Sequence, residues 1–145
     1  MFSFIHSRRN GRKGEADFLT YYPAAQKSPD LAYDFILDGQ KIELKTEFRT
    51  LEQTPNFFME RYGNLEKLSD GGPWRAVIDR VDHFIYYFIH DKTFFWFRPE
   101  PLRTFLDEFI KGEKPKYIDN KTYKTVGYTI NREKVLTFCE KIDRF

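Results

Sequence analysis

Residues 33–46 read YDFILDGQKIELKT and carry the clearest local structural signal of the chain. Two short runs rich in β-forming residues flank Asp38-Gly39, the dipeptide that favours a two-residue type I′ turn. The pattern therefore predicts a β-hairpin. If the loop consists of those two residues alone, Asp34 and Glu43 lie directly opposite each other on one face of the sheet.

The predicted hairpin gathers charge on one face. Like charges opposite each other destabilise a sheet, so Asp34 and Glu43 need a compensating partner. A divalent cation would supply it, because Mg²⁺ takes oxygen ligands and usually accepts one or two protein carboxylates. Lys45 lies two residues after Glu43 and shares its face, where an ammonium group could support charge developing on a phosphate. Two acids, a metal ion and a lysine together predict a site for phosphodiester hydrolysis.

A helix is expected before the hairpin, over about residues 14–22. At about 100° per residue, Glu15 shares a stripe with the apolar Phe18, whereas Asp17 points away. Glu15 is therefore either a further acidic residue of the site or a first-turn carboxylate that favours the helix dipole.

The rest of the chain predicts the remaining elements of one α/β domain. Expected strands cover residues 56–62, 84–89, 93–97 and 125–130, and expected helices cover 73–81, 102–110 and 131–142. The run 84–89 does not alternate, which is typical of a strand buried on both faces. The order is helix, three strands, helix, strand, followed by additions.

Length and composition limit the class of protein. The chain has 145 residues, enough for a single domain, and aromatic residues account for 19% of it. The formal net charge of +2 announces neither a nucleic-acid nor a membrane partner. A single cysteine, Cys139, cannot form an internal disulfide and favours a reducing compartment. The sequence contains no HExxH, GxxxxGK[ST] or GxGxxG motif, which disfavours zinc hydrolases and the usual nucleotide-cofactor enzymes.

The location expected from the sequence is the cytoplasm. The longest strongly apolar run, Phe84 to Ile89, is too short to cross a bilayer, so no membrane partner is expected. The N-terminal residues place apolar side chains before arginines, the reverse of a signal peptide.

Two basic clusters are candidates for contact with nucleic acid. Four cations precede the first predicted helix and could hold phosphates beside the site, or form a solvated arm: Arg8, Arg9, Arg12 and Lys13. The second cluster combines lysines with two tyrosines, a mixture that can add base stacking to charge, and we interpret it as an ordinary surface loop: Lys111, Lys114, Lys116, Tyr117, Lys121, Tyr123 and Lys124.

From Gly14 to Ile89 the chain resembles the PD-(D/E)xK nuclease superfamily, in its order of elements and in Asp34 followed by Glu43-Leu44-Lys45. The resemblance implies a restriction-endonuclease-like core of helix, three strands, helix and strand, with a mixed central sheet flanked by helices. The core would occupy roughly residues 14–97 of a single domain, and residues 98–145 would add strands and helices at the C-terminus.

The same resemblance implies roles for individual residues. Lys45 would support the attacking water. Mg²⁺ or Mn²⁺ would be bound by Asp34, Glu43, the carbonyl of Leu44 and Glu15.

Two positions stay open at this point. A literal Pro29-Asp30 pair makes Asp30 a rival of Asp34 for the first acid, although Asp30 falls in a predicted turn and hairpin register favours Asp34. Glu60 could be a further ligand or a partner of Lys45, but we favour a salt bridge to Arg61 or a solvent-facing role.

The expected function is that of a Mg²⁺- or Mn²⁺-dependent nuclease, a phosphodiesterase that acts as an endonuclease on DNA, with RNA not excluded. A homodimer and a phage origin would suit so short a chain. The alternative is a non-catalytic nucleic-acid-binding or protein-interaction domain, in which Asp34, Glu43 and Lys45 form a surface ion-pair cluster.

Overall fold

The computed structural model describes the backbone of residues 4–145 and the side chains from residue 11 onward. The helices are α1 (Phe4–Tyr21), α2 (Gly72–Ile78), α3 (Pro99–Phe109), α4 (Arg132–Leu136) and the 3₁₀ turn η1 (Ile89–Asp91). The strands are β1 (Gln26–Lys27), β2 (Phe35–Leu37), β3 (Gln40–Glu47), β4 (Asn56–Asn64), β5 (Ser69–Asp70), β6 (His83–Phe88), β7 (Thr93–Phe97), β8 (Lys116–Asp119), β9 (Lys124–Asn131) and β10 (Cys139–Arg144).

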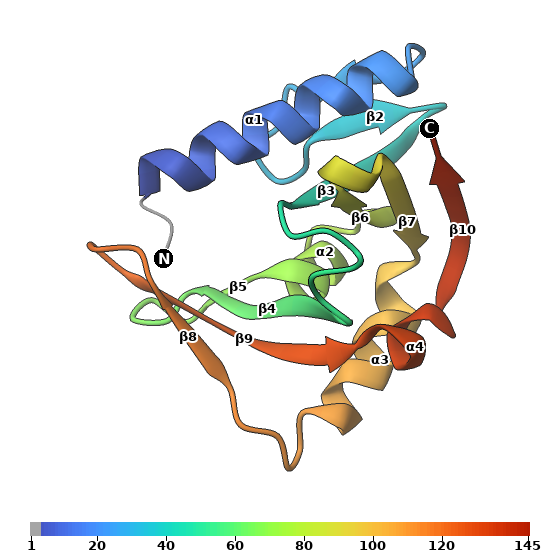
Figure 1. Ribbon diagram of the computed structural model, residues 1–145. Coiled ribbons are helices and arrows are strands. Elements are labelled where there is room, and N and C mark those ends of the chain that lie inside the picture. The colour runs from blue at the N-terminus through green and yellow to red at the C-terminus, as the bar shows by residue number, and fades with distance from the viewer. Residues whose placement is uncertain (1–3) are drawn as a thin grey trace.

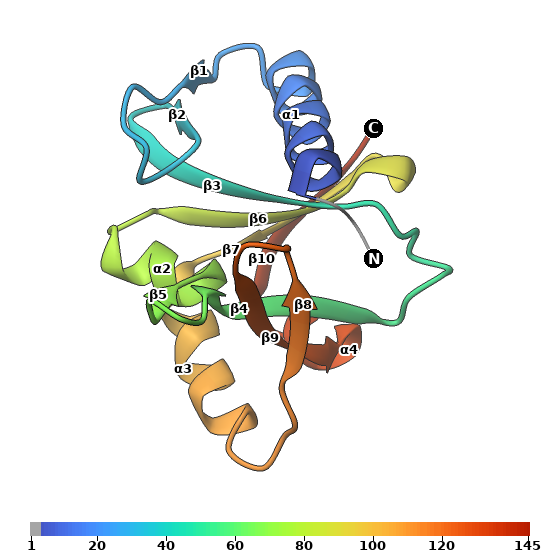
Figure 2. The same cartoon turned by 90° about the vertical axis from the view of Figure 1, so that its left-hand side faces the viewer.

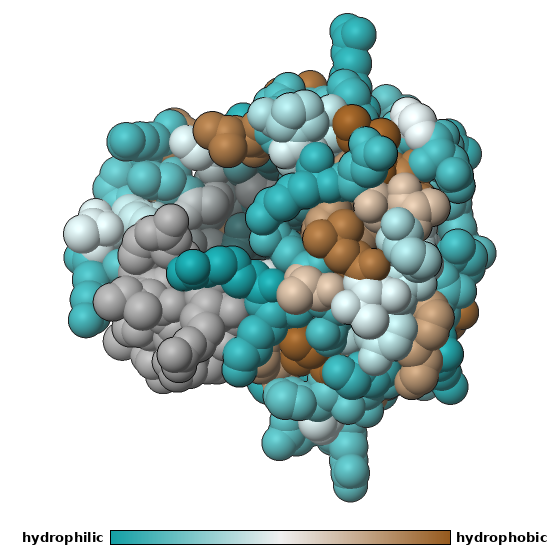
Figure 3. Space-filling view, turned by 90° about the horizontal axis from the view of Figure 1, so that it is seen from above, coloured by the Kyte–Doolittle hydropathy of each residue, from teal (hydrophilic) through white to brown (hydrophobic). Residues whose placement is uncertain are grey.

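These elements form an α/β structure with a mixed central sheet flanked by helices. Sheet A has the strand order β1-β2-β3-β6-β7-β10, and sheet B has the order β5-β4-β9-β8. Helix α1 covers one face of sheet A, while sheet B and helices α2 and α3 lie on its other side (Figures 1 and 2). The surface seen from above the view of Figure 1 is largely hydrophilic, with hydrophobic residues interspersed (Figure 3).

The predicted hairpin is confirmed with the expected register. Leu37 pairs with Gln40, and Phe35 pairs with Ile42. Asp38 and Gly39 have φ values of 51° and 76°, as a type I′ turn requires. Strand β2 begins only at Phe35, so the acid before it, Asp34, stands just beyond the last paired residue.

The core is aromatic on both sides of sheet A. Strand β6 runs parallel to β3 and is buried on both faces, as its uninterrupted apolar sequence predicts. On the side of sheet B, the ring of Phe57 contacts four aromatic neighbours edge-on: Tyr86, Phe88, Phe95 and Phe97. On the other side, Phe18 of α1 packs on Phe35 and Trp96. This packing holds α1 on one side of β3 and sheet B on the other.

Three expectations about the elements need correction. Helix α1 begins at Phe4 rather than near residue 14. The strand predicted over residues 56–62, the third in the expected order, is β4, and it pairs with β5 and β9 in sheet B rather than with the hairpin. The predicted helix over 131–142 is wrong after Leu136, because the chain continues as β10 and pairs antiparallel with β7. The segment pairs with the backbone N–H and C=O groups at the edge of β7. This pairing stabilises the strand by more than the helical spacing of its apolar residues favours a helix.

A glycine sets the distance between α1 and β3. A Cβ atom added to the buried Gly14 would lie 1.8 Å from Oγ1 and 2.8 Å from Cβ of Thr46, and the latter atom cannot rotate away. We expect Gly14→Ala to lower the free energy of unfolding by about 1–3 kcal/mol, as overpacking does. Gly11→Ala on the same helix meets nothing within 4 Å and should be neutral or stabilising. Urea denaturation of the two variants checks this, and equal stabilities would contradict the close packing.

Candidate active site

The end of β2 leaves part of the β3 backbone to be satisfied by a side chain. The Asp34 N–H donates to the carbonyl of Ile42 over 2.9 Å. The Leu44 N–H then donates to Oδ2 of Asp34 over 2.8 Å. The carboxylate of Asp34 therefore continues the strand pairing where the β2 backbone has turned away, and it is held next to the centre of β3.

Three carboxyl groups meet at this strand end. Burial raises the pKa of Glu43 well above its usual range, and the hydrogen bond and charge of Asp34 raise it further. Burial also raises the pKa of Glu15, again with the charge of Asp34 as the next cause, while Lys27 acts in the opposite direction. Lys27 Nζ lies 3.6 Å from Glu15 Oε2. The structure thus brings Glu15, Asp34 and Glu43 together with too little positive charge to balance them.

The backbone of Leu44 faces the same opening. The N–H and C=O of one strand residue point to the same side of the strand, as the paired bonds of an antiparallel ladder require. Because the Leu44 N–H points to Asp34, the Leu44 carbonyl is directed to this edge too. An oxygen from the backbone can therefore join those of the carboxylates.

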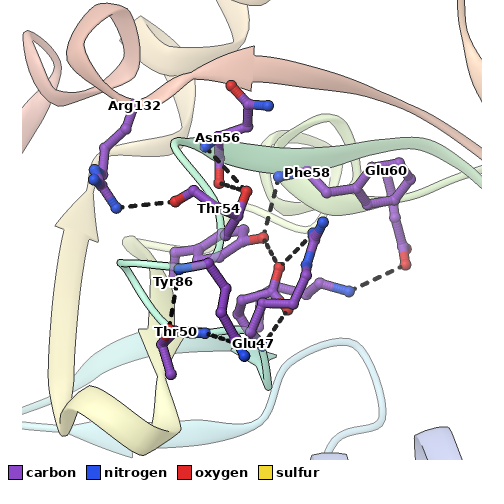
Figure 4. A network of polar contacts seen from close by, with 11 residues as sticks. Glu47, Thr50, Thr54, Asn56, Phe58, Glu60, Tyr86 and Arg132 are labelled. Carbon is purple, nitrogen blue, oxygen red and sulfur yellow. Dashed lines mark hydrogen bonds and ion pairs between the residues drawn. The ribbon is translucent and has the colours of Figure 1, made fainter.

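Lys45 is held by an acid from the other sheet. Its ammonium nitrogen lies 3.6 Å from Oε1 of Glu60 on β4 and 6.0 Å from the ring centre of Phe58. Figure 4 shows Glu60 at one end of the polar network that connects the two sheets. The favoured pairing of Glu60 with Arg61 is wrong, because Arg61 pairs with Asp70, and the alternative of a partner for Lys45 is what the structure shows.

A cavity of about 230 Å³ is lined by Glu43 of the cluster and by Lys45, Glu60, Gly72 and Arg75, among others. Gly72 has a φ of 48°, and a Cβ there would lie 2.8 Å from the carbonyl oxygen of Glu60, so only glycine lets α2 begin this close. Arg75, one turn after the glycine pair that starts α2, is bound to Asp79 over 2.6 Å.

The remaining predicted site residues are placed differently. Arg12 and Lys13 are exposed on α1, and the side chains of Arg8 and Arg9 lie outside the described residues. The expectation that Asp17 points away from the core is wrong, since its Oδ2 accepts a 2.6 Å hydrogen bond from the buried Tyr87. Helix α1 therefore presents two acids toward sheet A, and only Glu15 joins the cluster.

The rival acid Asp30 lies apart from the cluster. It is exposed in a turn, where its Oδ1 accepts from the Ala32 N–H over 2.9 Å.

We expect Asp34→Asn to reduce the rise in melting temperature that Mn²⁺ gives the wild type, and Asp30→Asn to leave it unchanged. Thermal unfolding with and without Mn²⁺ compares the two variants. A loss confined to Asp30→Asn would reverse the assignment.

The donor chemistry of the cluster suits a hard cation. Carboxylate and carbonyl oxygens are the ligands of Mg²⁺ and Mn²⁺, and the site offers no thiolate or imidazole that would favour zinc. Among the described residues, no three His, Cys, Asp or Glu side chains are already spaced as a metal site. A cation would therefore have to rearrange these carboxyl groups when it binds.

Neither a protein-family model nor a curated protein sequence matches this chain. Within residues 4–145, no helix is both long and apolar enough to cross a membrane. The geometry of the cluster is therefore what supports a functional conclusion.

Proposed function

We propose that the protein is a Mg²⁺- or Mn²⁺-dependent nuclease with a restriction-endonuclease-like core and that DNA is its substrate. The observation that carries the proposal is the convergence of Glu15, Asp34 and Glu43 where β2 begins, with Lys45 two residues after Glu43 on β3. A fold gains nothing from half-buried like charges gathered at one point. Their accumulation beside a cavity favours a site that binds a cation.

The chain offers several oxygen donors for such an ion. Asp34 and Glu43, the carbonyl of Leu44 and Glu15 would hold it. When bound, a divalent ion would supply Lewis-acid stabilisation of the charge that develops on a phosphodiester.

Lys45 would act on the reacting groups directly. Its ammonium group is fixed by Glu60 at the cavity wall, so it can donate a hydrogen bond without first being ordered. A preorganised donor of this kind orients the attacking water and stabilises negative charge on the phosphate in the transition state. Arg75 lines the same cavity and would add a second cation for the phosphate.

The proposal is tested by incubating the protein with linear duplex DNA, plasmid, single-stranded DNA and RNA in Mg²⁺, Mn²⁺ or EDTA. We expect cleavage that requires the metal and falls by at least about 1,000-fold in Glu43→Gln, since metal-site charge is worth several kcal/mol to the transition state. Glu52→Gln removes a similar charge from an exposed loop and should cleave normally. Cleavage in EDTA, or unchanged cleavage by Glu43→Gln, would contradict the proposal.

One observation favours the non-catalytic alternative. Lys45 and Glu60 already form an ion pair, with side chains 35% and 30% exposed, as a surface ion-pair cluster would. A domain of that kind would bind nucleic acid or protein without metal. It would show neither cleavage nor a Mn²⁺-dependent rise in melting temperature, and the same experiments therefore separate the two functions.

A further inference from the structure

We propose that the groove between β3 and the β8–β9 hairpin binds a single-stranded segment of nucleic acid, an inference that rests on the proposed nuclease function. The groove has a volume of about 650 Å³. It shares Leu44, Lys45, Phe58 and Glu60 with the smaller cavity that Glu43 lines. A nucleic-acid strand bound in the groove would therefore extend directly to Lys45 and the cavity beside it.

The far wall of the groove is aromatic. Tyr117 lies on β8, the edge strand of sheet B, and is 62% exposed. Tyr123, Phe48 and Phe58 line the groove as well. An exposed ring is a platform on which a base can stack, and stacking accepts any base because each has a π face.

The near wall carries a cation in a fixed position. Arg49 Nη2 donates to Glu47 Oε1 over 2.8 Å, and the Arg49 N–H donates to Oε2 over 3.1 Å. Burial alone would raise the pKa of Glu47, but the hydrogen bonds and charge of Arg49 lower it, so the pair stays ionised. Tyr86 also donates to Glu47, as Figure 4 shows.

The held guanidinium remains available to a ligand. The Arg49 side chain is 49% exposed, whereas that of Glu47 is 12% exposed. Lys116 stands exposed on the opposite wall. Two cations on either side of aromatic rings suit a backbone of phosphates whose bases turn inward.

The arrangement favours a single strand over a duplex. In a duplex the base faces are hidden in the stack, so only the backbone and base edges reach a protein. The rings of the groove could then contribute nothing. The sequence suggested that the lysine-rich segment was an ordinary surface loop, but from Lys116 onward it forms β8 and the turn that complete this wall.

Fluorescence anisotropy in EDTA tests binding separately from cleavage, with labelled dT20, rU20 and a 20-base-pair duplex as probes. We expect the wild type to bind the single strands more tightly than the duplex. Tyr117→Ala should weaken dT20 binding by about 5- to 100-fold, and Tyr117→Phe should retain it, since one base loses its stacking partner only in the first. Arg49→Gln should lower the slope of log affinity against log salt by about 0.7.

Arg144→Gln is the charge control, because Arg144 lies on β10, across the molecule from β8 (Figure 1). It should leave dT20 binding unchanged. Equal weakening by Arg144→Gln, tighter binding of the duplex, or no effect of Tyr117→Ala would each overturn the groove assignment while the cleavage assay still judges the nuclease. Binding of single strands by a protein that cleaves nothing would instead keep the groove and overturn the nuclease.

Discussion

Lys45→Ala is expected to lower the rate of DNA cleavage by about 100- to 10,000-fold, the range for loss of one preorganised catalytic group. Mn²⁺ binding should persist, because the oxygen donors stay in place and the variant removes a positive charge from their surroundings. Single-turnover cleavage and a Mn²⁺ titration followed by calorimetry measure the two effects separately.

A matched control lies on the same strand and face. Lys41 is four residues before Lys45 on β3, where its ammonium group lies 5.3 Å from the ring centre of Tyr33. Lys41→Ala should cleave at the rate of the wild type. If both variants lose the same activity, the effect is that of general charge on phosphate binding, and Lys45 has no special role.

Local patterns carried most of what could be predicted about the site. The hairpin register follows from Asp38-Gly39 and strand alternation, so the neighbourhood of Asp34 and Glu43 could be predicted from a few adjacent residues. Glu15 could be placed on the inner face of α1 by helical periodicity. These relations depend on short separations along the chain, where geometry leaves few alternatives.

Contacts between distant elements could not be predicted in the same way. The pairing of Lys45 with Glu60 depends on β4 lying in a second sheet under β3, which no local pattern specifies. Likewise, β10 is a strand because the edge of β7 is free, although its apolar residues recur at helical spacing. In both cases tertiary pairing overrides the preference of the segment.

The site conflicts with the stability of the fold. Without a cation, burial and Asp34 oppose the ionisation of Glu43, and the folded protein holds this proton more tightly than the unfolded chain does. A glutamate in the unfolded chain ionises near pH 4.3. Stability from the protonated Glu43 is therefore complete below about pH 4.3 and is lost as the pH rises toward the elevated pKa of the folded state.

Glu43→Gln should therefore stabilise the metal-free protein at neutral pH, by about 1–3 kcal/mol at pH 7, while it abolishes cleavage. The advantage should vanish near pH 4, and Glu52→Gln should show no such pH dependence. Mn²⁺ at about 100 times its dissociation constant would add about 2.7 kcal/mol to the wild type alone, so the order of stability should level or reverse. Urea denaturation at several pH values, in EDTA and in Mn²⁺, measures each term. If Glu43→Gln is less stable than the wild type in EDTA at pH 7, Glu43 is a structural residue. A carboxylate that serves to bind a cation is instead expected to destabilise the fold when the cation is absent.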